Sequence, residues 1–262
     1  MEELMNNYLL IDDVSGLIIG KCTEIIGLSS ELKQITDNHY EITLVGLRID
    51  EAYILHCLSS KSKITISGFN LNILGKDGKE IGSYCFFPHK LFSFPKNANF
   101  QEKMNLPLSG GFSVAPSYEA MKIWKKWMIA KPTVINTWAG MSQKQRLGWS
   151  EVVRLHSRFN TYRNNDAENE HFYLDMAHVT DILSFYCALG EAMNGPGGYY
   201  GFCLDSVEDC FYGGFGAKPP FHLHFRNKHL DELICMKNVK RADLTRLIHL
   251  KDMFIAHQVT LV

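Results

Sequence analysis

One short stretch constrains the fold and function of this 262-residue chain more than any other. It spans residues 194–211 and reads NGPGGYYGFCLDSVEDCF. Residues 195–198, Gly-Pro-Gly-Gly, are strong turn formers, and a pair of tyrosines and a glycine follow them. Residues 202–211 then have the apolar spacing of a short amphipathic helix. The stretch therefore predicts a tight turn that leads directly into a helix.

Carboxylates dominate this predicted helix. Asp205, Glu208 and Asp209 lie close together, and the helix itself contains no basic residue. Aspartates four residues apart share one helix face, where they repel each other by about 0.2–0.5 kcal/mol. A basic partner surface would relieve this repulsion, and Tyr199 and Tyr200, which we expect to be exposed, would add contact area. The alternative interpretation is a solvated acidic face beside two core tyrosines.

From residue 172 to the C-terminus, the chain resembles the barstar family of intracellular ribonuclease inhibitors. The shared pattern is a strand ending in Leu-Asp, a helix, a Tyr-Tyr-Gly turn, a Leu-Asp-x-x-x-Asp helix and a strand led by proline. The resemblance implies three parallel strands with about four helices. It also implies a 1:1 complex with a ribonuclease toxin, in which acidic side chains replace the phosphates of RNA in the nuclease active site.

The resemblance also assigns partner-binding residues by their place in the motif. Asp209 corresponds to the dominant contact of the family, and Tyr199 and Asp205 fall on further contact positions. Cys203 stands where the family usually has Asn, and Glu208 stands where the best-known member has Trp. These two departures favour an altered partner. The full set of expected partner-binding residues is Tyr199, Tyr200, Gly201, Cys203, Leu204, Asp205, Glu208 and Asp209.

Composition limits the other classes of function. A net charge of −1 lacks the basic bias of a general nucleic-acid binder. The sequence contains no apolar run of membrane-spanning length, and its acidic start, MEELMNN, does not resemble a signal peptide. Seven scattered cysteines form no Cys-x-x-Cys pair, which argues against a zinc ribbon or a disulfide framework. We expect a cytoplasmic bacterial protein with no cofactor and no contact with membranes or nucleic acid.

Residues 1–95 are expected to form an antiparallel β-rich domain. Strand patterns occur at residues 8–11, 17–22, 40–47, 63–67, 69–74 and 81–87. Between the last two, Lys-Asp-Gly-Lys at 76–79 predicts a hairpin turn. Residues 88–116 contain four prolines and predict a linker or surface crossing without regular structure. This domain is interpreted as a scaffold or as a partner-binding module.

Residues 96–165 are expected to form a linker and a helical bridge. Residues 117–131 and 142–158 have amphipathic helical patterns, with Ser117 as an N-cap. The tryptophans in this segment favour core packing. The alternative is an RNA-stacking platform with nearby lysines. The residues concerned are Trp124, Trp127, Trp138, Trp149, Lys125, Lys126 and Lys144.

Residues 166–262 are expected to form the barstar-like domain of an α+β multidomain protein. Strand patterns occur at 172–174, 221–225 and 257–262, and helical patterns occur at 180–193, 202–211, 230–236 and 244–254. Strands that are separated by helices predict a small parallel sheet with helices packed against it.

Histidines and cysteines supply two weaker candidates for chemistry. His222 and His224 alternate on a predicted strand and share one face, but two ligands do not make a metal site. Cys203 or Cys210 could pair with His222 as a nucleophile, a combination that arises easily by coincidence in this sequence. We therefore expect neither catalytic nor metal-binding residues. The prediction is an inhibitor or immunity protein; the alternative is a non-catalytic interaction or regulatory module with a non-ribonuclease partner.

Overall fold

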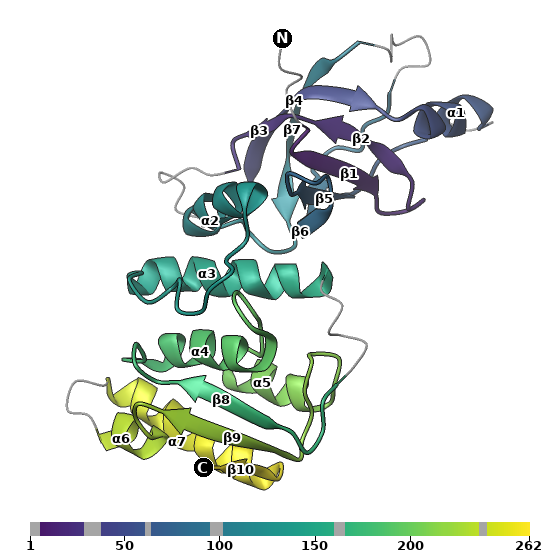
Figure 1. Ribbon diagram of the computed structural model, residues 1–262. Helices are drawn as coiled ribbons and strands as arrows, with labels where there is room; N and C mark the ends of the chain where they lie inside the picture. Colours follow the sequence, from purple (N-terminus) through teal and green to yellow (C-terminus); the bar gives the residue numbers. More distant parts are fainter. Residues whose placement is uncertain (1–5, 29–37, 61–63, 95–101, 160–165, 236–239) are drawn as a thin grey trace. The chain divides into compact units, whose positions relative to one another are not determined.

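The computed structural model describes residues 6–28, 38–60, 64–94, 102–159, 166–235 and 240–262 (Figure 1). The chain divides into two compact units, Met1–Ala130 and Lys131–Val262. This boundary lies within the 96–165 segment that the sequence pattern assigns to a bridge. No helix in the described part of the chain is long and apolar enough to cross a membrane.

The first unit is built on an antiparallel sheet of seven strands in the order β2-β1-β5-β6-β7-β4-β3. An additional pairing of β2 with β4 joins the two sides of the sheet, so that six strands form a closed ring. The strands are β1 (Tyr8–Asp12), β2 (Ile18–Cys22), β3 (Glu24–Ile26), β4 (Tyr40–Ile49), β5 (Phe69–Leu74), β6 (Glu80–Pro88) and β7 (Met104–Phe112). The two predicted hairpins, β1–β2 and β5–β6, are confirmed.

Two predictions for this unit are wrong. Residues 88–116 contain the nine-residue strand β7, which pairs with both β4 and β6. Gly110 permits this pairing because a Cβ there would lie only 2.3 Å from the carbonyl oxygen of Phe87. Residues 64–67 form no strand; Ile66 makes only an isolated bridge to Phe92, and residue 63 lies outside the described residues.

Two helices accompany the sheet. Helix α1 (Glu51–Ser59), capped by Asp50, is absent from the sequence predictions. Helix α2 (Tyr118–Ile129) begins after Ser117, whose hydroxyl accepts a hydrogen bond from the Ala120 amide, as predicted for an N-cap. One face of α2 is buried, in keeping with its amphipathic pattern.

Tryptophan burial in both units rules out the alternative of an RNA-stacking platform. Trp124 packs against Gly82 and donates a hydrogen bond to the hydroxyl of Tyr84. Stacking on bases requires exposed ring faces, whereas all four tryptophans are buried. Their role is core packing. The buried indoles are those of Trp124, Trp127, Trp138 and Trp149.

The second unit contains a parallel three-stranded sheet in the order β10-β9-β8. Its architecture agrees with the predicted alternation of strands and helices, and the predicted 142–158 helix, α3, precedes it in the same unit. The elements are α3 (Gln143–His156), η1 (Ser157–Phe159), β8 (His171–Asp175), α4 (Ile182–Asn194), α5 (Leu204–Phe211), β9 (Phe221–Arg226), α6 (Leu230–Cys235), α7 (Arg241–Ala256) and β10 (Val259–Leu261).

The sheet of the second unit has a core face and an open face. Leu174, Phe221, Leu223 and Val259 are buried on the core face, against which α4 and α7 pack. Alternate residues of β8 and β9 are exposed or half-buried on the other face. Parallel strands normally have both faces covered, so the open face is a feature that requires a reason.

Candidate functional site

Helix α5 presents its carboxylates to solvent. Val207, Cys210 and Phe211 are buried, whereas Asp205 and Asp209 on the opposite side are exposed. Neither aspartate forms an ion pair with a described residue. The structure thus brings the two predicted contact aspartates together on one accessible face.

Cys203 directs the start of this helix. Its backbone is extended, and its amide donates a hydrogen bond to Oγ of Ser206 at 2.9 Å. The Ser206 hydroxyl in turn donates to the Cys203 carbonyl, and the Cys203 thiol donates to Oγ of Ser206 at 3.2 Å. Cys203 and Leu204 are half-buried. Cys203 therefore acts at the helix N-terminus mainly through its backbone.

The prediction that two tyrosines are exposed is wrong. Tyr199 and Tyr200 are both buried, and burial raises the pKa of each phenol above its ordinary value. The Tyr200 hydroxyl donates to the carbonyl of Ala217 at 2.9 Å, while the Tyr199 ring packs against Phe215. These contacts make the tyrosine pair part of the core that supports the helix.

Gly201 is required by the chain itself. Its φ of +88° lies in the region that favours glycine, and a Cβ would lie 2.4 Å from Cγ2 of Val207 and 2.7 Å from the Val207 amide nitrogen. Glycine is therefore needed for the turn itself, where Gly201 approaches the first turns of α5.

Glu208 has a basic neighbour that the sequence pattern does not reveal. Its Oε1 lies 3.6 Å from Nε2 of His257, which follows α7. Both side chains are only partly buried, so the interaction is weak even when the histidine is protonated. Glu208 consequently lies at the edge of the acidic face, where α5 adjoins the C-terminal helix.

Two exposed aromatic residues flank the acidic face and are missing from the predicted set. Tyr212, seven residues after Asp205 and thus on the same side of the helix, is 77% exposed. Phe202, just before the helix, is 39% exposed, and Arg154 lies over its ring at 5.3 Å. The i, i+4, i+7 spacing of Asp205, Asp209 and Tyr212 was the available signal.

A hollow of about 380 Å³ lies at the N-terminal end of α5. Its most unusual member is Tyr186, which is buried and whose hydroxyl has no hydrogen-bond partner among the described residues. Burial raises the pKa of this phenol, and the charges of Asp205, Arg246 and Asp243 also act on it. The lining residues are Ile182, Leu183, Tyr186, Phe202, Cys203, Leu204, Asp205 and Arg246.

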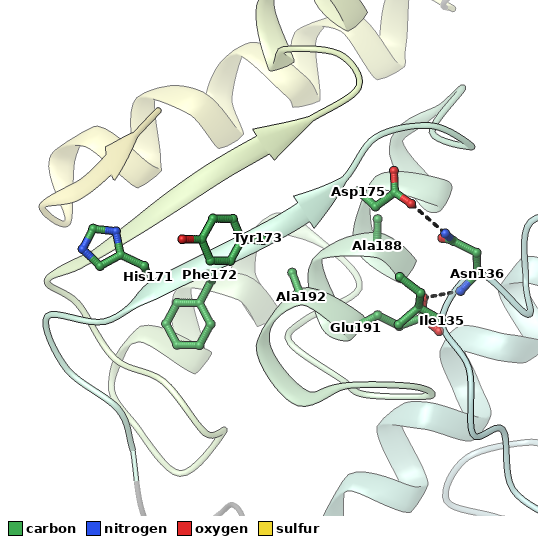
Figure 2. Close-up of a pocket in the computed structure, with 9 residues that line it drawn as sticks. All are labelled: Ile135, Asn136, His171, Phe172, Tyr173, Asp175, Ala188, Glu191 and Ala192. Atoms are coloured by element: carbon green, nitrogen blue, oxygen red, sulfur yellow. Dashed lines mark hydrogen bonds between the residues drawn. The ribbon is translucent and has the colours of Figure 1, made fainter.

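A second hollow, of about 170 Å³, lies beside β8 and α4 (Figure 2). Asn136 joins its two carboxylates, donating from its amide nitrogen to Glu191 at 2.8 Å and from Nδ2 to Asp175 at 2.8 Å. Glu191 also accepts a hydrogen bond from the indole of Trp138. Asp175 also accepts hydrogen bonds from the side-chain amide of Asn227 and the backbone amide of Ala177. The carboxylates are thus satisfied by the protein and serve the fold.

The histidine candidates gain a third member. His171 on β8 lies beside His222 and His224 on β9, with its Nδ1 2.7 Å from Nε2 of His224. In the described chain, no group of three or more His, Cys, Asp and Glu side chains could hold a metal ion. The cysteine candidate Cys210 is buried in the core, whereas the histidine with which it could pair, His222, lies on the open face of the sheet.

Comparison of the chain with family models, curated proteins and solved structures gives no match.

Proposed function

We propose that this protein is a non-catalytic inhibitor that blocks the active site of a ribonuclease toxin through the α5 surface. The observation that carries the proposal is the pair of exposed carboxylates of Asp205 and Asp209 on one helix face, neither of which forms an ion pair with a described residue. Support from the sequence is the resemblance of residues 172–262 to the barstar family. The proposal places the protein in the bacterial cytoplasm as the immunity partner of the toxin.

The proposed chemistry is imitation of a polyanion. Ribonucleases hold the phosphates of RNA with lysine, arginine and histidine side chains, and two adjacent carboxylates present comparable negative charge. The exposed position of Asp205 and Asp209 makes this charge available to steer association, and salt should weaken that steering. Tyr212 and Phe202 would supply the aromatic contact area that protein interfaces favour.

The hollow beside Asp205 would receive one side chain of the nuclease. Its apolar walls suit an aliphatic stem, and its Tyr186 hydroxyl is a buried polar group without a partner in the described chain. Leaving such a group unsatisfied costs about 1–3 kcal/mol. A lysine or arginine head group that reaches both Asp205 and the hydroxyl would remove this cost on binding.

The experiment is capture of the partner by the full-length protein, followed by RNA cleavage with the captured protein. Wild type should retain a nuclease that is inactive in the complex and active after release. Asp205→Ala/Asp209→Ala should release it. Asp252→Ala is the matched control, because Asp252 is an exposed aspartate outside the motif. Equal retention by all three proteins would refute the proposed interface.

A second candidate function retains the scaffold and changes the partner. Cys203 and Glu208 favour it, because they depart from the family pattern at the start and edge of the acidic face. The protein would then be an interaction or regulatory module for a protein other than a ribonuclease. Capture of a partner that depends on Asp205 and Asp209 but does not cleave RNA after release would select this alternative.

A further inference from the structure

The open face of the β8–β9 pair carries a row of stacked side chains that is separate from the α5 surface. The register places His171 opposite His222 and Tyr173 opposite His224. Together with Arg226, at the end of β9, these residues are called the imidazole face. In Figure 2 the His171 and Tyr173 rings lie on the other side of β8 from Phe172. The imidazole face is therefore separate from the hydrophobic core.

The rings of the imidazole face form one continuous stack. The His171 ring lies 4.4 Å from that of His222 and 5.0 Å from that of His224. Tyr173 lies 4.9 Å from His224, and the Arg226 guanidinium lies 4.4 Å from the centre of the Tyr173 ring. The ring faces are occupied by one another, so a ligand would meet nitrogen-bearing edges instead of stacking surfaces.

Among the described residues, Asp175 is the carboxylate that the register places beside this stack. Arg226 forms no ion pair with a described carboxylate. Asp175, its neighbour in the register, accepts hydrogen bonds from Asn136, Ala177 and Asn227 instead. Adding a proton to any imidazole therefore places a second positive charge on a face where Arg226 has no ion-pair partner among the described carboxylates.

The contact between His171 and His224 links anion binding to protonation. Their ring nitrogens, Nδ1 and Nε2, are 2.7 Å apart, so one must donate and the other must accept. If both rings become protonated, both nitrogens are donors and the contact turns repulsive. An oxyanion at the ring edges would accept from both nitrogens and would offset the charge of Arg226.

We propose that the imidazole face binds an oxyanion of the phosphate class, with the guanidinium of Arg226 and protonated imidazole edges as donors. Partial burial and the positive charges of His171, His222 and Arg226 lower the pKa of His224. Thr260 on β10, beside His222, adds no charge to this face. For an oxyanion whose own charge does not change between pH 8 and 6, binding should strengthen as the pH falls, because the bound protein contains more protons.

The test is an NMR titration of the full-length protein carrying ¹³C-labelled histidine, with inorganic phosphate as the probe and chloride added to keep ionic strength constant. Phosphate should shift the His171 and His224 signals and raise their pKa values. Sulfate, whose charge does not change between pH 8 and 6, should bind with a lower Kd at pH 6 than at pH 8 if one imidazole proton is linked to binding. Identical titrations in phosphate and in chloride would overturn the proposal.

Three variants locate the site. His224→Gln and Arg226→Gln should each weaken phosphate binding at pH 6 by fivefold or more, as expected for loss of a charge-assisted contact of about 1 kcal/mol. His249→Gln is the matched control, because His249 is an exposed histidine on α7. Equal Kd values for all three variants would place the anion elsewhere and overturn the assignment. None of these positions lies on α5, so this outcome leaves the inhibitor proposal untouched.

A last comparison identifies the source of the oxyanion. Adenosine 5′-monophosphate and adenosine differ only in the phosphate group. Shifts with the nucleotide that match those with inorganic phosphate would show that a phosphate ester is accepted. Shifts with inorganic phosphate alone would restrict the site to the free ion. The same shifts with adenosine would overturn the proposal, because recognition would then not depend on phosphate.

Discussion

The indole Nε1 of Trp138 donates a hydrogen bond of 2.9 Å to the carboxylate of Glu191, 53 residues further along the chain. Glu191 also accepts from the amides of Asn136, at 2.8 Å, and Gly197, at 3.4 Å. One buried side chain therefore connects the segment before α3 to the turn that leads into α5. The connection lies within the second compact unit, Lys131–Val262.

Replacing Glu191 by alanine should destabilise the protein. The change strands the indole of Trp138 and the amide of Asn136, each at about 1–3 kcal/mol. Glu191→Gln should lower the free energy of unfolding by less, because the remaining side-chain oxygen still accepts hydrogen bonds. Urea unfolding of the full chain, followed by circular dichroism, measures both. Glu170→Ala, at an exposed glutamate, should change the free energy of unfolding by less than about 0.5 kcal/mol; a comparable loss there would contradict the role of Glu191.

Asp181 should make stability depend on acid pH. Burial alone would raise the pKa of this carboxyl, but hydrogen bonds from Ser184 and the charge of Arg146, 2.5 Å away, hold the pKa below 3.8. A lowered folded-state pKa means that the unfolded chain takes up the proton first, so this stability is present above pH 3.8 and is lost as the pH falls further. In Asp181→Asn, the free energy of unfolding should no longer show this loss as the pH falls below 3.8, which unfolding measured at a series of acid pH values can check.

The same substitution should also lower stability at pH 7. Arg146 is largely buried and has no other carboxylate partner among the described residues, and breaking a buried pair costs about 3–5 kcal/mol. Thermal unfolding at pH 7 of wild type, Asp181→Asn and the exposed control Asp231→Asn, whose partner Lys251 is also more exposed, provides the measurement. Equal melting temperatures for all three would disprove this prediction.

Two glycines with positive φ should respond differently to alanine. Gly201→Ala would place a methyl group 2.4 Å from Val207, in addition to the backbone strain at φ +88°. Gly214 has φ +81° and open space around its Cα, so Gly214→Ala adds only the conformational cost of about 1 kcal/mol. Differential scanning calorimetry should give Gly201→Ala a much lower melting temperature than Gly214→Ala. The reverse order would show that the turn around Gly201 readily rearranges.

The exposed and buried tyrosines should separate binding from stability. Tyr212→Ala removes a 77% exposed ring beside the acidic face and should weaken partner binding by about 1 kcal/mol or more while leaving the melting temperature unchanged. Tyr200→Phe removes the hydrogen bond to Ala217 and should lower stability by about 1 kcal/mol. Its effect on binding should be small. Calorimetry of the captured complex and of the free variants distinguishes the two residues.

Truncation should show where the second unit begins. A fragment of residues 131–262 retains Trp138, Arg146 and α3, which contact Glu191, Asp181 and α4 respectively. A fragment of residues 166–262 loses all three. We expect the longer fragment to unfold cooperatively on heating. The shorter fragment should unfold at a lower temperature or show no cooperative transition. Equal transitions for both fragments would make the domain start at residue 166.

Much of the secondary structure could be predicted because it depends on local pattern. The hairpin turn at residues 76–79, the N-cap at Ser117 and the acidic helix each rest on a few neighbouring residues. Strand β7 could not be predicted in the same way. Its one proline, Pro107, and its two glycines oppose regular structure locally, and pairing with β4 and β6, far away in the sequence, stabilises it.

For the candidate site, the sequence by itself determined that Asp205 and Asp209 share a helix face, because the helical repeat alone places residues four apart side by side. Only the tertiary structure decided which neighbouring side chains are accessible. It buries Tyr199 and Tyr200, exposes Tyr212 and brings His171 beside His224. Burial and contact between distant residues depend on how helices pack and strands align, and local spacing carries no record of that.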